Sequence, residues 1–160
     1  MFKSHKYLPV FLIIFILLFN TISKSETINK IEIIGNDRIP SQTITMFANV
    51  NLQEEIDDKK INTILKNLYE TNFFENISVK VENNLLVIKV KEFPIIENIF
   101  YEGLRAKKLK EAVKKNLILK SRSSFNKFLL EKDKNTMSNS LKDFGYYFSK
   151  IDTFVEYLDD

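Results

Sequence analysis

The side chains that could do chemistry in this chain are mainly acids, lysines and arginines. Its 160 residues include no cysteine and a single histidine, His5. The lack of cysteine excludes disulfides, thiol catalysis and cysteine-ligated metals. The sequence shows no nucleophile–base pair and no glycine-rich phosphate loop, so it predicts a protein that is not an enzyme and needs no cofactor.

Four acids lie close together as Glu54-Glu55 and Asp57-Asp58. Such a cluster could hold a cation, but it lacks the constrained ligand spacing of a calcium loop. Acids in the first turn of a helix interact favourably with the helix dipole, and an apolar helical pattern follows these four. The sequence therefore predicts a helix start here and no metal site.

A basic run occupies residues 104–127, where Glu111 is the only acid. Two interpretations stay open: attraction of an acidic partner or of anionic lipid headgroups, and a solvated helix surface. Leu109, Ala112 and Val113 give the segment a buried side, which favours the second interpretation. The candidate basic patch is Arg105, Lys107, Lys108, Lys110, Lys114 and Lys115, and the run continues with Lys120, Arg122 and Lys127.

Residues 1–25 have the composition of a secretory signal peptide. Lysines precede an apolar run over 8–19, and Ser23-Lys24-Ser25 places small residues around a cleavage position. The run has 12 residues and includes Pro9, whereas spanning a bilayer takes about 20. This favours removal over a retained membrane anchor, and export without cysteines points to a bacterial periplasm. Removal leaves 21 basic and 21 acidic residues, a balance that gives no reason to expect nucleic-acid binding.

The clearest structural pattern covers residues 76–92, where two runs of alternating apolar and polar residues flank Asn83-Asn84. Alternation with β-branched residues predicts two strands with one buried face. Asparagine tolerates positive φ, so the Asn pair suits a two-residue type I′ turn, which fixes the register. The predicted facing pairs are Val81–Leu86, Val79–Ile88 and Ile77–Val90.

The residues before this hairpin predict the elements that cover it. A strand over 28–34 ends at Gly35, and a short apolar stripe around Phe47 predicts a first helix. Asp57 suits the N-cap of a second helix, whose apolar residues recur at helical spacing from Ile61. The order strand, helix, helix, strand, strand defines a first unit over residues 26–93.

The same order returns in residues 94–160. Ile28 and Gly35 reappear as Ile96 and Gly103, each 68 positions later, and recurrence at a steady period indicates a tandem array. The second unit is predicted to have strands over 95–102 and 146–158 and helices over 107–116 and 127–144, with Gly145 ending the longer helix. A partner strand equivalent to 85–92 is missing, so we expect an incomplete unit at the front of a longer protein.

Several segments resemble the POTRA domains of the outer-membrane protein assembly factor family, BamA-like. Residues 31–39 are similar to that family's opening strand and Gly-Asn-x-Arg-Ile turn. Residues 68–77 are similar to its Leu-Tyr-x-Thr-Gly-x-Phe-x-x-Val segment, with Asn72 in place of the glycine. Residues 87–94 are similar to its Val-x-Val-x-Glu-x-Pro ending. In the second unit, 99–103 and 143–147 match more loosely.

The resemblance implies an α+β fold of tandem βααββ units, each a three-stranded mixed sheet packed against two helices, with the second truncated before its last strand. It also implies a periplasmic arm, on the periplasmic face of the outer membrane, that precedes a C-terminal transmembrane β-barrel of the same protein. Such arms bind unfolded outer-membrane proteins and dock accessory lipoproteins.

The resemblance further implies that the second strand of each unit lies at a sheet edge, where its free N–H and C=O groups can pair with an extended client. Outward Lys80 and Glu82 could instead blunt the first edge. Phe73, Phe74, Tyr146 and Tyr147 are predicted to be core or inter-unit contacts. The candidate client-binding residues are Asn76, Ile77, Ser78, Val79, Lys80, Val81 and Glu82, and in the second unit Phe148, Lys150, Asp152 and Phe154.

Two other functions stay open. An inner-membrane component of cell division or polypeptide secretion with POTRA-like units would retain the 8–19 run as its anchor. A periplasmic enzyme would need a catalytic region beyond residue 160.

Overall fold

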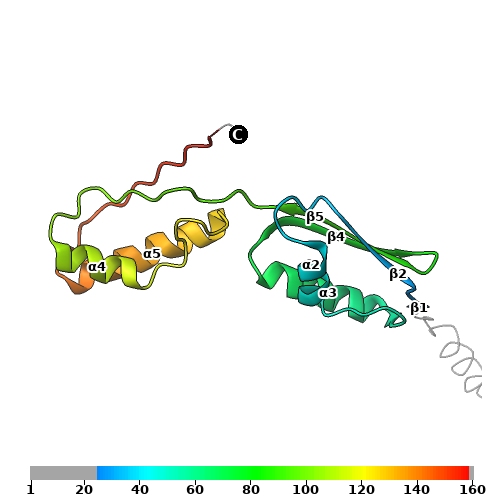
Figure 1. The fold of residues 1–160 in the computed structure, drawn as a ribbon. Coiled ribbons are helices and arrows are strands. Elements are labelled where there is room, and N and C mark those ends of the chain that lie inside the picture. The colour runs from blue at the N-terminus through cyan, green and yellow to red at the C-terminus, as the bar shows by residue number, and fades with distance from the viewer. Residues whose placement is uncertain (1–24, 159–160) are drawn as a thin grey trace, which may run out of the picture.

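The computed structural model describes residues 25–158, so residues 1–24 of the predicted signal peptide lie outside the described part. Two lobes are joined by an extended segment around Pro94 (Figure 1). No helix within residues 25–158 is long and apolar enough to cross a membrane. The elements are β1 (Glu26–Thr27), β2 (Lys30–Ile34), α2 (Ser41–Ala48), β3 (Glu55–Ile56), α3 (Asp58–Glu70), β4 (Phe74–Glu82), β5 (Leu85–Glu92), α4 (Lys107–Lys115) and α5 (Lys127–Asp143).

The first lobe contains a mixed three-stranded sheet in the order β2-β5-β4. The central strand β5 runs parallel to β2 and antiparallel to β4. A separate pair of two-residue strands, β1 and β3, is antiparallel. The predicted α+β class and the mixed three-stranded sheet of the first unit are therefore confirmed.

The hairpin between β4 and β5 forms as predicted. Asn83 and Asn84 have φ values of 51° and 63°, which are the two positive φ angles of a type I′ turn. The register pairs Val81 with Leu86, and the other two predicted pairs also face each other. The inner face of the sheet is thus set by a local turn and by an alternating pattern.

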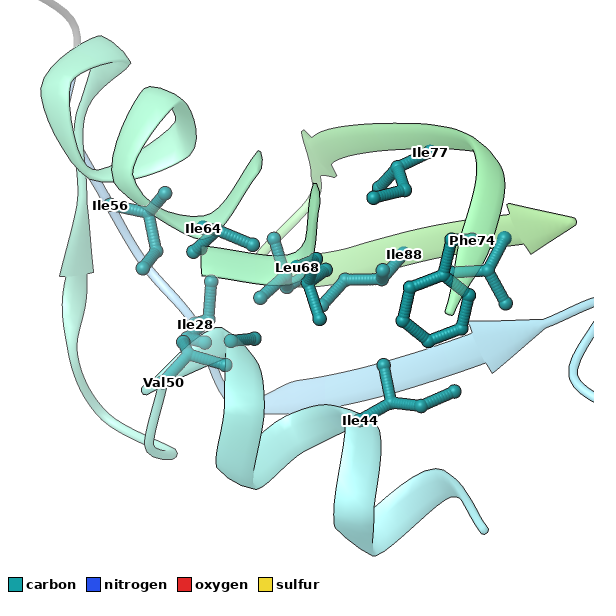
Figure 2. Close-up of a cluster of buried hydrophobic side chains, with 12 residues drawn as sticks. Ile28, Ile44, Val50, Ile56, Ile64, Leu68, Phe74, Ile77 and Ile88 are labelled. Atoms are coloured by element: carbon teal, nitrogen blue, oxygen red, sulfur yellow. The ribbon is translucent and has the colours of Figure 1, made fainter. Parts of the chain in front are cut away.

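Helices α2 and α3 cover one face of this sheet (Figure 2). The Asp57 side chain caps α3 by accepting from the Lys60 N–H at 2.7 Å, as predicted for an N-cap. Burying this apolar face supplies the main stabilisation of a small α+β unit. The core consists of Ile28, Ile44, Ala48, Val50, Ile56, Ile64, Leu68, Phe74, Ile77, Leu86, Ile88 and Val90.

The internal repeat is visible in the backbone of both lobes. The Ile28 N–H donates to the Glu54 carbonyl, and the Ile28 carbonyl accepts from the Gln53 N–H. Ile96 makes the same two bonds, with Ser123 and Arg122. Gln53 and Arg122 both have positive φ, 64° and 68°. The two lobes therefore begin with the same local pattern of backbone hydrogen bonds.

The second lobe has the two predicted helices, α4 and α5. The helix α5 ends at Asp143, and Gly145, whose φ is 89°, follows its C-cap residue Phe144. The Gly145 N–H donates to the Lys142 carbonyl, and the Tyr146 N–H to the Leu141 carbonyl. This is the Schellman arrangement in which glycine takes the left-handed position, so the predicted role of Gly145 is confirmed.

The prediction of strands over residues 95–102 and 146–158 is wrong. Residues 146–149 form a turn, and residues 96–102 and 150–158 form no strand. Within residues 25–158, Ile95 makes only an isolated bridge, to Ser124. In the first lobe, β2 and β4 both bond to β5 and not to each other. None of the described residues takes the place of β5 in the second lobe, so neither segment has a neighbour with which to form a ladder.

A buried acid in α5 holds the loop that follows α4. Asp133 accepts from the Ile118 N–H at 2.9 Å and from the Leu119 N–H at 2.8 Å, and its side chain is buried. We expect Asp133→Asn to leave one of the two N–H groups without an acceptor and to lower the local opening free energy by about 1–3 kcal/mol. Hydrogen exchange at Ile118 and Leu119 measures this, with exposed Asp143→Asn as the control; equal exchange in both variants would contradict the role.

Candidate functional site: the free edge of the first sheet

The strand β4 is an edge of the sheet because only β5 bonds to it. In a hairpin with a two-residue turn, the residues flanking the turn bond to each other, and bonding then alternates along the strand. Glu82, Lys80 and Ser78 therefore bond to β5, as their pairing positions require. The N–H and C=O groups of Val81, Val79 and Ile77 consequently point to the free edge.

One of these edge amides already has a partner. The Ile77 N–H donates to the Tyr69 hydroxyl at 3.3 Å, and Tyr69 lies near the end of α3. The edge that remains open for pairing is therefore centred on Val79 and Val81. The sequence analysis did not predict this bond, because nothing in the helical spacing of α3 shows which strand amide the Tyr69 hydroxyl would reach.

The open part of the β4 edge carries two charged side chains. Lys80 and Glu82 are exposed on the face of the sheet opposite the helices, as predicted. Among the described ion pairs, neither of them takes part, whereas Glu75 pairs with Lys91 at 2.7 Å at the other end of the hairpin. Asn76 and Ser78 are also exposed, so the edge is lined by short or flexible polar groups on its solvent side.

The second predicted client-binding strand does not form. Phe148 and Phe154 are almost fully exposed, and Lys150 pairs with Asp152 at 3.0 Å. Of the four aromatics predicted as core or contact residues, Phe73 and Phe74 pack in the first core. Tyr146 and Tyr147 are exposed instead, because their unit has no sheet to cover them.

The basic patch lies on the solvent side of α4, whose inner side buries Leu109 and Val113. Lys107 reaches Glu111 at 4.0 Å, and Lys114 lies 4.3 Å from the centre of the Tyr101 ring. Burial, and secondarily the nearby Asp133 carboxylate, raises the pKa of Tyr101. The remaining patch lysines and Arg105 are exposed or half-buried, and they take part in no ion pair within residues 25–158. A solvated helix surface accounts for this arrangement.

The acidic cluster is used within the first lobe. Glu54 pairs with Lys60 and accepts from the Asn51 N–H at 3.0 Å. These interactions lower the pKa of Glu54 below its usual 4.5, with the Lys60 hydrogen bond as the largest cause. Asp57 is the α3 cap, and Asp58 is in the first turn. No group of three or more His, Cys, Asp or Glu within residues 25–158 could hold a metal ion.

The Glu54 pair predicts a pH-dependent contribution to stability. A lowered folded-state pKa stabilises the fold fully above the unfolded value of 4.5, and the contribution is lost as the pH falls below it. We expect the difference in unfolding free energy between the unmodified chain and Glu54→Gln to shrink from pH 7 to pH 3 in urea titrations. Lys60→Gln, which removes the partner of Glu54, should remove most of this pH-dependent contribution to the unfolding free energy. A gap that stays constant with pH would contradict this assignment.

A second buried acid fixes the end of β5 at the junction between the lobes. The Glu92 Oε1 accepts from the N–H groups of Asp37, Arg38 and Ile39 at 3.0, 3.1 and 3.0 Å. The Arg38 Nε lies 3.1 Å from Oε2, and its Nη2 donates to the Phe93 carbonyl at 2.6 Å. The turn after β2 is therefore a cradle for one carboxylate.

The comparisons with known proteins agree with this fold. A family model, POTRA, described as surface antigen variable number repeat, matches residues 26–92 and again 94–160. Two solved structures are similar in fold: the N-terminal domain of Omp85 from Thermosynechococcus elongatus, with a TM-score of 0.56 at 12% identity, and POTRA1-3 of the periplasmic domain of Omp85 from Anabaena, with 0.54 at 11%. Each alignment covers 78% of this chain and 54% of the other.

Two curated relatives are outer membrane protein assembly factors BamA. The one from Neisseria meningitidis serogroup B is 33% identical over 92 residues, which is 57% of this chain and 11% of that protein. The one from Neorickettsia risticii is 21% identical over 90 residues, 56% of this chain and 12% of that protein. Because the family model matches two segments that together cover most of the sequence, the chain belongs to the POTRA family.

Proposed function

We propose that the chain is a non-catalytic periplasmic arm of an outer-membrane protein assembly factor, and that it binds unfolded outer-membrane proteins as its clients. In this proposal the chain is exported to the cell envelope and acts at the periplasmic face of the outer membrane. The proposal rests on the free edge of β4, where the backbone N–H and C=O groups of Val79 and Val81 point outward. A strand that adds to this edge pairs through its backbone, so the edge accepts many sequences.

Accessory lipoproteins are the second class of partner in this proposal. The similarity to two proteins described as outer membrane protein assembly factors supports a role in outer-membrane assembly, the setting in which such a partner would act. The exposed basic patch on and beside α4 belongs to the second lobe, whereas the β4 edge belongs to the first. A partner could therefore dock while a client is paired.

The substitution Val79→Pro tests whether a client pairs with the backbone at the β4 edge. The substitution removes an N–H that faces the free edge and leaves the β4–β5 bonds in place, so we expect binding of a labelled alternating apolar–polar peptide to weaken about ten-fold, as for loss of about 1.4 kcal/mol. Fluorescence anisotropy measures binding, and hydrogen exchange at residues 76–82 locates it.

Val79→Ala is the matched control, because it trims the same side chain and keeps the N–H. Tyr69→Phe is a second variant that frees the Ile77 N–H, and we expect it to strengthen binding or to extend the protected segment. Equal affinities for Val79→Pro and Val79→Ala, together with no effect of Tyr69→Phe, would remove the β4 edge from the mechanism.

A further inference from the structure

The two lobes are joined by one extended segment, residues 92–96, which we call the junction (Figure 1). Within the described part of the chain, no hydrogen bond, ion pair or ring contact links residues 27–92 directly to residues 97–158. Each of the two hydrophobic clusters likewise consists of residues from one lobe. The orientation of one lobe relative to the other is therefore controlled by the backbone torsions of the junction.

The first lobe holds the peptide groups on both sides of Phe93. The Phe93 N–H donates to the Phe73 carbonyl at 2.9 Å. The Phe93 carbonyl accepts from the Arg38 Nη2 at 2.6 Å. Because a peptide group is planar, this second bond also orients the nitrogen of Pro94. The first lobe thus fixes the chain as far as the start of Pro94.

The second lobe holds the chain on the other side of Pro94. The Pro94 carbonyl accepts from the Phe125 N–H at 2.8 Å. The Ile96 N–H donates to the Ser123 carbonyl at 2.9 Å, and the Ile96 carbonyl accepts from the Arg122 N–H at 2.6 Å. The peptide group that follows Pro94 is therefore anchored in the second lobe.

Only one soft torsion remains between these two anchored peptide groups. They are separated by the φ and ψ angles of Pro94, and the pyrrolidine ring fixes φ. If the Phe93 carbonyl were released, ψ of Phe93 would become a second free torsion, restricted only by the proline that follows it. The hydrogen bond to this carbonyl therefore decides whether the lobes rotate about one bond or about two.

The Arg38 side chain is held in place for this bond. Its Nε lies 3.1 Å from the Oε2 of the buried Glu92, and its backbone N–H donates to the Glu92 Oε1 at 3.1 Å. Within residues 25–158, Arg38 is the only group paired with Oε2. A guanidinium presents its N–H groups in a rigid planar fork, so the contact of Nε with the carboxylate directs Nη2 toward the Phe93 carbonyl.

We propose that Arg38 is a positioning residue of the junction, which latches the Phe93 carbonyl and so limits rotation between the lobes to the ψ torsion of Pro94. This role goes beyond the proposed function, because it concerns how the lobes are joined and not what they bind. A partner that contacts both lobes loses less conformational entropy when the junction has one free torsion than when it has two.

Pulsed electron spin resonance measures the spread of distances between spin labels on the two lobes. The chain contains no cysteine, so cysteines introduced at Asn62 in α3 and at Asn139 in α5 are labelled alone. Both asparagines are exposed. We expect Arg38→Lys to broaden the distance distribution about two-fold, because lysine keeps a positive charge beside Glu92 but lacks the fork that also holds the Phe93 carbonyl. An unchanged width would overturn the latch.

The matched control is Asp37→Ala, which changes the neighbouring exposed residue and keeps the backbone N–H that binds Glu92. We expect it to leave the width of the distribution unchanged. Equal broadening by Asp37→Ala and Arg38→Lys would show that the guanidinium is not the cause. Pro94→Ala frees φ and should broaden the distribution by itself. If it did not, the lobes would be held by something other than the junction, and the proposal would fail.

A second pair of labels separates the latch from the folding of the first lobe. Asn62 on α3 and Lys89 on β5 both belong to this lobe, and both are exposed. The distribution between them should keep its width in Arg38→Lys, because the Glu92 Oε1 retains its three backbone donors. Broadening within the lobe as well as between the lobes would show that Arg38 stabilises the whole lobe, and would overturn its role as a latch.

Discussion

Glu92→Ala should destabilise the first lobe more than any other change to a charged residue within it. The Glu92 side chain is only 4% exposed and satisfies three backbone N–H groups at once. Removing one partner of a buried ion pair typically costs about 3–5 kcal/mol. We expect about 3 kcal/mol, because Arg38 is 38% exposed and water can solvate part of what is lost. Hydrogen exchange of the β5 amides in the full chain measures the change.

The control for Glu92→Ala is Glu75→Ala, on the neighbouring strand. Glu75 pairs with Lys91 at 2.7 Å, but the two side chains are 49% and 71% exposed. Exposed pairs of this kind contribute about 0–1 kcal/mol. If both variants lowered the opening free energy equally, the cradle formed by residues 37–39 would have no special role in stability.

The position of Glu92 shows what the sequence could have revealed. Leu86, Ile88 and Val90 alternate on the buried face of β5, and Glu92 continues the same face. An acid on a buried face needs partners for its charge, so the register alone indicates that something must meet this carboxylate. Which backbone amides do so depends on how the turn after β2 approaches β5, and that approach is a long-range contact.

Local signals predicted the first lobe well. The Asn83-Asn84 turn, the Asp57 cap and the period-two strands depend on residues within a few positions of one another, and all three are confirmed. Asn72, which stands where the POTRA pattern has glycine, takes the same left-handed conformation, with φ at 58°. Asparagine is one of the few residues other than glycine that adopt this conformation readily.

In the second lobe, the sequence predicted the helices correctly but not the strands. The helices α4 and α5 form near their predicted bounds because each has an apolar side, and the Asn126 side chain caps α5 by accepting from the Phe128 N–H. The segments 95–102 and 146–158 have strand-like patterns but no strand partner in the described residues. A helix satisfies its backbone within itself, whereas a strand depends on a neighbour that can lie far away in the sequence.

Gly35→Ala should be the most disruptive change to the turn that cradles Glu92. Gly35 has a φ of 83°, and a Cβ built on it would lie 2.3 Å from the Val90 carbonyl oxygen. The left-handed conformation alone costs an alanine about 1–2 kcal/mol. The contact is with backbone of the central strand, which cannot move aside without disturbing its ladder. We expect a loss of at least about 3 kcal/mol, with strain and overpacking combined.

Gly103 provides the matched control because it occupies the equivalent position of the repeat. Its φ is 77°, and no atom lies within 4 Å of a Cβ built on it. Gly103→Ala should therefore cost only the left-handed strain, about 1–2 kcal/mol, as measured by hydrogen exchange in the second lobe. The two variants separate steric overlap from backbone conformation, since the backbone strain is shared and the overlap with Val90 is not. Equal losses in the two lobes would show that the close approach of Gly35 to β5 contributes nothing, and that the glycine is needed only for its φ.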